Sequence, residues 1–238
     1  MMFDSRAAAR AADVATRLAR SGGTAVIQRL ISDMWTANAG RFEKGLGDTA
    51  RSLGVQCSEN LAEKLWDLRE DDSLRDAGFI VHRRHGATYL TFVELTIRFV
   101  KAPASSGLTP DWSGNFEWES NVRQEAAERN DNAYRAPRQV PGHEPLFRAD
   151  GVGDAENINE IFLVWNGLLE EAPLTAGWVT LPSLHPEHVI AAEPIWRDEP
   201  EARAHTSDAP VVSDPAAGSA PDLNIRLKKD VRVVRGDR

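Results

Sequence analysis

The chain has 238 residues, a hydrophobic content of 42% and a net charge of −8, so it can bury one substantial core or two small ones. Its single cysteine, Cys57, excludes an internal disulfide and a cysteine-based zinc cluster, which fits a reducing compartment. We see no signal peptide and no apolar stretch near the roughly 20 residues that span a bilayer, so we expect a cytoplasmic protein without a membrane partner.

The charge is unevenly distributed along the chain. Residues 1–105 carry 15 Lys and Arg against 13 Asp and Glu, whereas residues 106–201 carry 6 against 18 and residues 202–238 carry 7 against 5. An acidic middle region repels the phosphate backbone of nucleic acids. It suits a basic protein partner, or it serves solubility alone.

The first 77 residues have the periodicity of helices. The first expected helix covers residues 3–20, with Asp4 or Ser5 as its N-cap and Ser21-Gly22-Gly23 as its stop. Further helices are expected over residues 24–37, 41–53 and 58–71, the last with Ser58 as N-cap.

Alternating apolar and polar residues then predict strands. Residues 79–82 form a strand, residues 83–87 form a turn around Gly86, and residues 88–101 form one long strand with the odd positions on one face. An exposed helix is expected over 117–134, followed by strands over 161–165, 177–181 and 189–196.

Because helices come first and strands follow without a regular βαβ order, we predict an α+β fold with a mostly antiparallel sheet. Residues 1–101 would form a helical region with a β-hairpin, a winged-helix-like candidate, and residues 102–197 an acidic α+β region. Residues 198–221 are rich in Pro, Ala, Ser and acidic residues, with little apolar content, and read as a flexible linker.

Residues 222–238 read as a terminal strand and tail. Apolar and mostly basic residues alternate there, as they do in a strand with one apolar face. Such a strand can return to its own sheet, join the sheet edge of a partner, or stay unpaired. The residues that we expect to contact a partner are Leu223, Ile225, Arg226, Leu227, Lys228, Val231, Arg232 and Val233.

Residues 41–101 resemble a winged helix. Thr49–Val55 looks like the first helix and turn of a helix-turn-helix, with Ala50 and Gly54 four residues apart, and the helix 58–71 and the hairpin follow in winged-helix order. The would-be recognition helix is acidic, which opposes contact with phosphates. If the region binds DNA, the contacts would come from Arg51, Arg83 and Arg84.

The catalytic motifs that we searched for are weak or missing. His185 and His188 flank Pro186 and Glu187, but zinc hydrolases place two histidines four apart on a helix, so this pair is a weak metal candidate. Cys57 precedes the expected start of a helix, where a thiolate would be stabilised, yet nothing else marks it as activated. The sequence has neither the nucleotide-binding P-loop motif nor the serine-hydrolase motif, and we expect no cofactor.

The sequence therefore favours a non-enzymatic protein-binding or regulatory subunit of a bacterial-type cytoplasmic assembly, such as a toxin–antitoxin or defence complex. In that interpretation the terminal strand pairs with a partner. The alternative is a winged-helix DNA-binding regulator that uses residues 41–101. A third interpretation is a metal-dependent hydrolase that uses His185 and His188.

Overall fold

The computed structural model describes residues 4–84, 86–103, 107–112, 118, 120–135, 154–169, 173–185 and 188–199. The chain divides into a compact unit over Met1–Pro200 and a second unit over Glu201–Arg238, and the described residues belong to the first. Apart from Asp198 and Glu199, the linker expected over 198–221 and the terminal strand expected over 222–238 lie outside the described residues.

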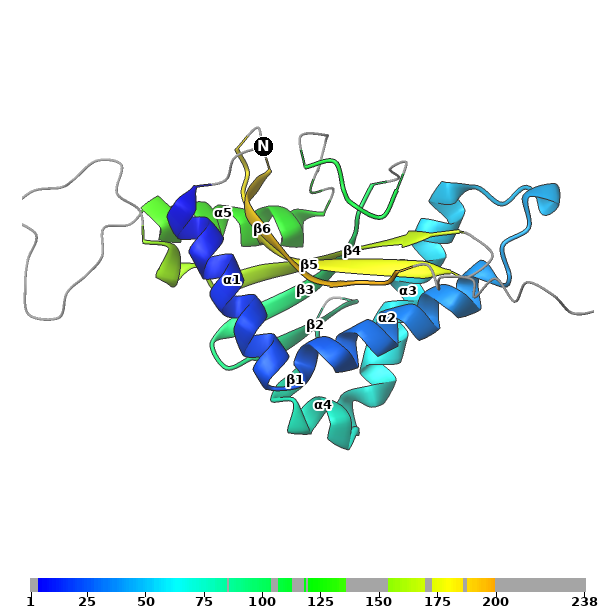
Figure 1. Ribbon diagram of the computed structural model, residues 1–238, viewed down its shortest axis with the longest axis horizontal. Helices are drawn as coiled ribbons and strands as arrows, with labels where there is room; N and C mark the ends of the chain where they lie inside the picture. Colours follow the sequence, from blue (N-terminus) through cyan, green and yellow to red (C-terminus); the bar gives the residue numbers. More distant parts are fainter. Residues whose placement is uncertain are drawn as a thin grey trace, which may run out of the picture. The chain divides into compact units, whose positions relative to one another are not determined.

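The described residues form one six-stranded sheet in the order β1-β2-β3-β4-β5-β6, with helices on both faces (Figure 1). Neighbouring strands are antiparallel except for β3 and β4, which are parallel. The α+β class predicted from the sequence is confirmed. The strands are β1 (Phe79–Arg84), β2 (Ala87–Phe92), β3 (Leu95–Lys101), β4 (Glu160–Leu168), β5 (Leu174–Pro182) and β6 (Val189–Arg197).

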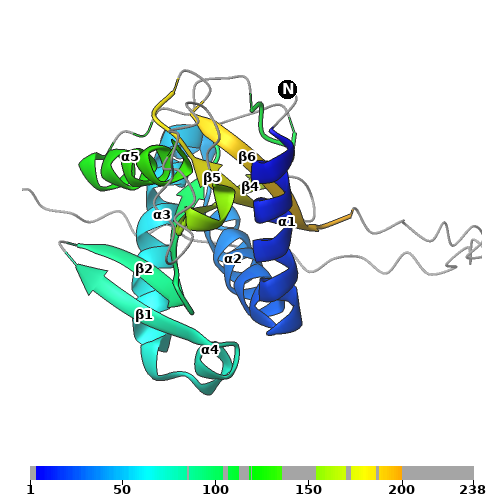
Figure 2. The ribbon, with the colours of Figure 1, turned by 90° about the vertical axis from the view of Figure 1, so that its left-hand side faces the viewer.

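The helices form two layers that enclose the centre of the sheet. They are α1 (Ser5–Arg20), α2 (Gly23–Ala39), α3 (Ala50–Asp67), α4 (Asp72–Asp76) and α5 (Asn121–Arg135). In β4, Ile161, Leu163 and Trp165 pack into the core with α1, α2 and α3. Phe162 and Val164 point to the other face and pack with α5. Figure 2 shows α5 on the opposite side of β4 and β5 from α1 and α2.

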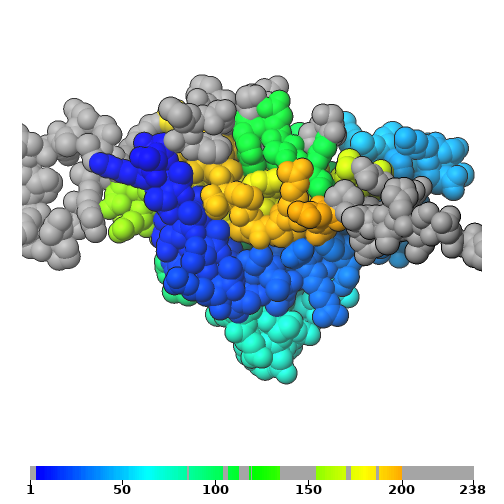
Figure 3. Space-filling model, in the orientation of Figure 1, coloured from blue at the N-terminus to red at the C-terminus, as the bar shows by residue number. Residues whose placement is uncertain are grey.

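The first two helices begin and end within two residues of the predicted bounds. The Asp4 carboxylate caps α1 by accepting from the backbone N–H groups of Arg6 and Ala7 at 2.9 and 3.2 Å. Gly22, with a φ of 78°, makes the left-handed step into α2. Figure 3 shows α1 at the surface beside the edge strand β6, against which it packs.

The predicted helix-turn-helix is wrong. Residues 50–67 form one continuous helix, α3, and Gly54 lies inside it instead of making a turn. Thr49 and Ser52 form a capping box that fixes the helix start, with hydrogen bonds of 3.1 and 2.9 Å. The buried residues Leu53, Cys57, Leu61 and Leu65 then continue at intervals of four across the glycine. Of the helix expected over 41–53, Lys44–Leu46 form a short 3-10 turn and residues 50–53 form the start of α3.

The single strand expected over 88–101 is also wrong. The chain reverses at Val93 and Glu94, which separate β2 from β3. On each side of this two-residue turn, buried apolar residues alternate with polar ones. The buried residues have even numbers before the turn and odd numbers after it. Leu90 and Phe92 are buried before the turn, and Leu95 and Ile97 after it. The Glu94 carboxylate accepts from both terminal nitrogens of Arg17, at 2.8 and 3.2 Å.

The remaining elements follow the sequence prediction more closely. The β1–β2 hairpin with its turn near Gly86 is confirmed, as are strands that contain residues 161–165, 177–181 and 189–196. The helix expected over 117–134 is α5 and begins at Asn121. The regions expected on either side of residue 101 share one sheet, because β3 lies beside β4.

The turn between β2 and β3 gives a first prediction. Val93 has a φ of 55°, a conformation that costs a β-branched residue roughly 1–3 kcal/mol, and its side chain is 74% exposed. We expect Val93→Gly to raise the free energy of unfolding by about 1 kcal/mol, after subtraction of the entropy that glycine adds to the unfolded chain. Urea denaturation measures the change. Val93→Ala, which keeps a Cβ atom, should gain less, and a loss of stability in Val93→Gly would contradict the assignment of strain to this turn.

Candidate functional site

The sheet splits between β2 and β3. The two strands pair over only three residues each, Leu90–Phe92 opposite Leu95–Ile97. Beyond that point β2 continues beside β1 back to Ala87, whereas β3 continues beside β4 as far as Lys101. We call the gap between residues 87–89 of β2 and residues 98–101 of β3 the fork. A cavity of about 550 Å³ opens there.

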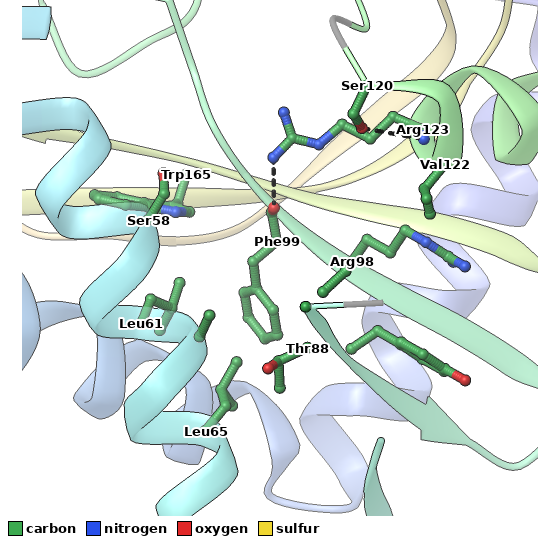
Figure 4. A pocket seen from close by; sticks show the side chains of 14 residues that line it. Ser58, Leu61, Leu65, Thr88, Arg98, Phe99, Ser120, Val122, Arg123 and Trp165 are labelled. Atoms are coloured by element: carbon green, nitrogen blue, oxygen red, sulfur yellow. Dashed lines mark hydrogen bonds between the residues drawn. The ribbon is translucent and has the colours of Figure 1, made fainter. Parts of the chain in front are cut away.

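The cavity has an apolar base and a polar rim (Figure 4). The base is made by α3 and by strand side chains, and the rim by β2, β3 and the start of α5. The apolar lining residues are Leu61, Ala62, Leu65, Ala87, Phe99, Val122 and Trp165, the polar ones are Ser58, Thr88, Tyr89, Arg98, Ser120 and Arg123, and Gly86 completes the lining. An apolar surface with polar groups that converge on it is a usual feature of a binding pocket.

The backbone of β3 is open on its fork side. The Thr96 N–H donates to the Asn159 carbonyl, just before β4, at 2.8 Å. The Ala102 N–H donates to the Trp165 carbonyl of β4 at 2.7 Å. Because peptide groups alternate in direction along a strand, those of Phe99 and Lys101 face the fork. There the Phe99 carbonyl accepts from Arg123 Nη2 at 3.4 Å (Figure 4), which brings the start of α5 to the strand edge.

Two arginines supply the charge of the fork. Among the described residues that line the cavity, the charged ones are Arg98 and Arg123. Arg98 is mostly buried, lies 5.2 Å from the Tyr89 ring centroid and forms an ion pair with Glu160. The Glu160 carboxylate also pairs with Arg129, at 2.6 Å. The Glu160 carboxylate thus pairs with two arginines, and Arg129 also pairs with Glu125 at 4.0 Å.

Two polar atoms of the fork have no hydrogen-bond partner among the described residues. They are Thr88 Oγ1 and Arg98 Nε, and both are buried. A buried polar atom without a partner costs about 1–3 kcal/mol. Both atoms can donate a hydrogen bond, but both are inaccessible to solvent, so neither faces the open cavity.

The position of α5, and therefore that of Arg123, is fixed by a set of buried hydrogen bonds. Asn130 exchanges hydrogen bonds with the backbone of Glu160, at 2.7 and 3.2 Å. The Asp131 carboxylate accepts from Ser183 Oγ at 2.6 Å and from the Leu184 N–H at 2.8 Å. These contacts tie the helix to the start of β4 and the end of β5, so α5 is held rigidly against the sheet.

Lys101 lies two residues after Phe99 and on the same face of β3, the face that packs against the core. Its ammonium is 5.6 and 5.7 Å from the ring centroids of Trp35 and Trp165. Burial lowers the pKa of Lys101 below its usual value of 10.5. Burial also raises the pKa of the neighbouring Cys57 thiol to about 11, and Lys101 opposes this shift only in part.

Cys57 is therefore a buried, neutral thiol within α3. The sequence places it before a helix start, but the helix begins at Ala50, seven residues earlier. A thiol with a raised pKa is a poor nucleophile at neutral pH. Its fully buried side chain makes it a core residue.

The residues expected to contact DNA are not brought together as a basic surface. Arg51 lies in the first turn of α3, and Arg83 binds Glu63 near the other end, twelve residues or about 18 Å of helix away. Arg83 also lies 5.8 Å from the Trp66 ring centroid. Arg84 is exposed on β1.

His185 and His188 lie in the connection between β5 and β6, as expected of loop histidines. Their backbones bond to each other, the His188 N–H donating to the His185 carbonyl at 2.6 Å. Across the described residues, no group of three His, Cys, Asp or Glu side chains is placed to hold a metal ion. The eight residues expected in the partner-binding terminal strand, from Leu223 to Val233, lie outside the described residues.

Comparison with protein-family models, curated proteins and solved structures finds no match for this chain. Among the described helices, none is both long and apolar enough to cross a membrane. The site is thus defined by its own residues. Sequence reasoning missed Thr88, Arg98 and Arg123, and the one available signal was the change of parity between Phe92 and Leu95, which marks where β2 turns back.

Lys101 gives a prediction about pH. Because its folded-state pKa lies below 10.5, the unfolded chain binds the proton more tightly, and stability rises with pH until about 10.5. We expect Lys101→Met to lack this rise. The advantage of the variant over the wild type in free energy of unfolding should therefore be largest near neutral pH and shrink as the pH approaches 10.5. Urea denaturation of both proteins across that range tests this.

The control is the variant Lys64→Met, which replaces an exposed lysine of α3 and so measures the general effect of removing a positive charge. If the stability difference between Lys101→Met and the wild type follows that of Lys64→Met at every pH, burial does not perturb Lys101 in solution.

Proposed function

We propose that this chain is a protein-binding, regulatory subunit without enzymatic activity, and that an extended segment of its partner binds in the fork. The observation that carries the proposal is the open edge of β3 beside a cavity of about 550 Å³. An unpaired strand edge offers backbone donors and acceptors to a further strand. Lys101 presents its backbone groups towards the fork, and Phe99 presents its N–H there, whereas the Phe99 carbonyl accepts from Arg123.

The lining of the cavity supports binding more than catalysis. Leu61, Leu65 and Trp165 can bury an apolar side chain of the partner, and Thr88, Arg98 and Arg123 can hold its polar groups. Strand addition gains affinity from backbone hydrogen bonds and specificity from such side-chain pockets. The described residues of the lining include no carboxylate, imidazole or thiol that could act as a general base or nucleophile there.

The terminal residues 222–234 belong to the same proposal as a second pairing element. Their alternation of apolar and basic residues suits the edge of a partner's sheet. The proposed assembly is bacterial-type and cytoplasmic, of the toxin–antitoxin or defence kind.

The proposal is tested by filling the cavity. Ser58 is exposed on α3 and lines the cavity, so Ser58→Trp should block the fork without disturbing the core. Gln56→Trp, also at an exposed position of α3 but not among the lining residues, is the matched control. We expect affinity purification and quantitative mass spectrometry to find a partner that is lost with Ser58→Trp and retained with Gln56→Trp. A partner profile that is the same for both variants would remove the fork from the proposal.

The terminal element is tested by deletion of residues 200–238. The chain must be kept through Asp198, because its carboxylate accepts from the Thr175 N–H at 2.7 Å and from Gln28 at 3.0 Å. We expect the free energy of unfolding to stay within about 0.5 kcal/mol of the wild type, while complex formation is lost. A loss of several kcal/mol would contradict this, because each buried Val, Leu or Ile contributes about 1.5–3 kcal/mol to a strand's own sheet.

A further inference from the structure

We infer that Arg123 acts as a latch on the open edge of β3, because its guanidinium holds the Phe99 carbonyl that an added strand needs. By the latch we mean the hydrogen bond from Arg123 Nη2 to the Phe99 carbonyl (Figure 4). This role of Arg123 rests on the proposed function and adds the regulation of the same site. A segment that enters the fork pairs with β3 only after the guanidinium has moved off the edge.

The Phe99 carbonyl is one of the backbone groups that β3 presents to the fork. The others are the Phe99 N–H and the two groups of Lys101, because every second residue of a strand faces the same neighbour. The residues between them face β4, as the Ala102 N–H does when it donates to the Trp165 carbonyl at 2.7 Å. A strand that pairs at Phe99 brings its own N–H to this carbonyl, so the Arg123 nitrogen at 3.4 Å from the oxygen stands in its path.

The helix that carries Arg123 is fixed, whereas the latch itself is a long hydrogen bond. The Arg123 N–H donates to the Ser120 carbonyl at 2.9 Å, and Asn130 and Asp131 anchor α5 to the sheet. The latch, at 3.4 Å, exceeds the usual range of about 2.7–3.2 Å for an N–H···O hydrogen bond. The helix therefore keeps the guanidinium beside the edge, and an added strand can replace the latch with a shorter bond.

The second arginine of the fork does not share this role. The Arg98 side chain is 14% exposed and pairs with Glu160, whose side chain is 13% exposed. A buried ion pair is costly to break, so Arg98 stays where it is when a segment enters. Arg123 is only half-buried, and its long side chain can leave the Phe99 carbonyl while the backbone of α5 stays in place.

A latch at this position makes the fork selective. Unpaired strand edges attract strands of other molecules, and proteins protect such edges with charged side chains. A segment that offers only its backbone has to displace Arg123 for little gain. A segment whose apolar side chains also reach Leu61 and Leu65 at the base of the cavity gains enough from their burial to offset the loss of the latch.

The probe is a heptapeptide with blocked ends in which Val and Thr alternate, labelled with an uncharged fluorophore. It favours the extended conformation and carries no charge, so loss of the Arg123 charge alone leaves its attraction to the protein unchanged. Arg123→Met keeps the apolar stem and Arg123→Ala removes it, and neither has the donor. Fluorescence anisotropy with the full-length protein should show that both bind the peptide about three- to tenfold more tightly than the wild type.

The matched control is Arg29→Met, which replaces an arginine whose side chain is 86% exposed on α2, and it should bind as the wild type does. Thermal melting checks that each variant is folded. Binding to Arg123→Met and Arg123→Ala that is no tighter than binding to the wild type would overturn the latch. The absence of binding to all of the proteins would overturn it as well, because an edge that accepts no strand has nothing to guard.

The carbon-13 chemical shift of the Phe99 carbonyl reports the latch without any ligand. It should move upfield in Arg123→Met, because the carbonyl loses a hydrogen-bond donor, and move back when the peptide binds. A shift that is the same in Arg123→Met and the wild type would show that the contact is not made in solution, which would also refute the latch.

These results are independent of the partner experiment. If Ser58→Trp loses the cellular partner while Arg123→Met binds the peptide no more tightly than the wild type, the proposed function stands and the latch fails. If Ser58→Trp keeps the cellular partner while Arg123→Met binds the peptide more tightly, the latch stands as a property of the fork and the proposed role in the assembly fails.

Discussion

The burial of β4 on both faces is the constraint from which the rest of the fold follows. Residues from Ile161 to Asn166 are all buried, so the strand needs one helical layer over each face. Its parallel pairing with β3 requires a crossover connection, and α5 belongs to that connection. Because β3 pairs with β4 as far as Lys101, it stays in the sheet where it no longer pairs with β2. The hairpin β1–β2 instead packs against α3, and the fork lies where β2 and β3 separate.

Most of the fold could be predicted from periodicity, because each buried stripe records which face meets the core. The failures came where one pattern fits two structures. A two-residue turn at Val93 and Glu94 keeps the alternation of a strand, so it is visible only as a change of parity. A glycine followed by a polar N-cap residue looks like the end of one helix and the start of another. The buried stripe through Leu53 and Cys57 nevertheless continues past Gly54, and α3 is one helix. The fork could not be predicted, because the loss of pairing between two adjacent strands depends on contacts with α3 that no local pattern records.

Charge shows the same difference between sequence and space. The region 106–201 is strongly acidic in sequence, and yet Arg123 lies in it and lines the cavity of the fork. Arg98 reaches the same cavity from the other half of the chain, and its guanidinium pairs with Glu160 of the acidic region. A regional sum of charges averages over surfaces that face in different directions, so it predicts solubility and the net field but not the sign of a pocket.

Several departures from ordinary protein rules lie in or beside β2 and β3. Val93 holds a left-handed φ, Thr88 and Arg98 each keep a buried donor without a described partner, and Lys101 is held as a buried cation between two indole rings. The unpaired buried donors and the left-handed φ cost stability, whereas the contact of Lys101 with the indole rings offsets part of the cost of its burial. Similar features occur at His188, which has a φ of 54° and a buried Nδ1 atom without a hydrogen-bond partner among the described residues, so such costs do not by themselves define a site. The fork is favoured as the proposed binding site because a cavity of about 550 Å³ opens there beside the edge of β3 that β2 leaves unpaired.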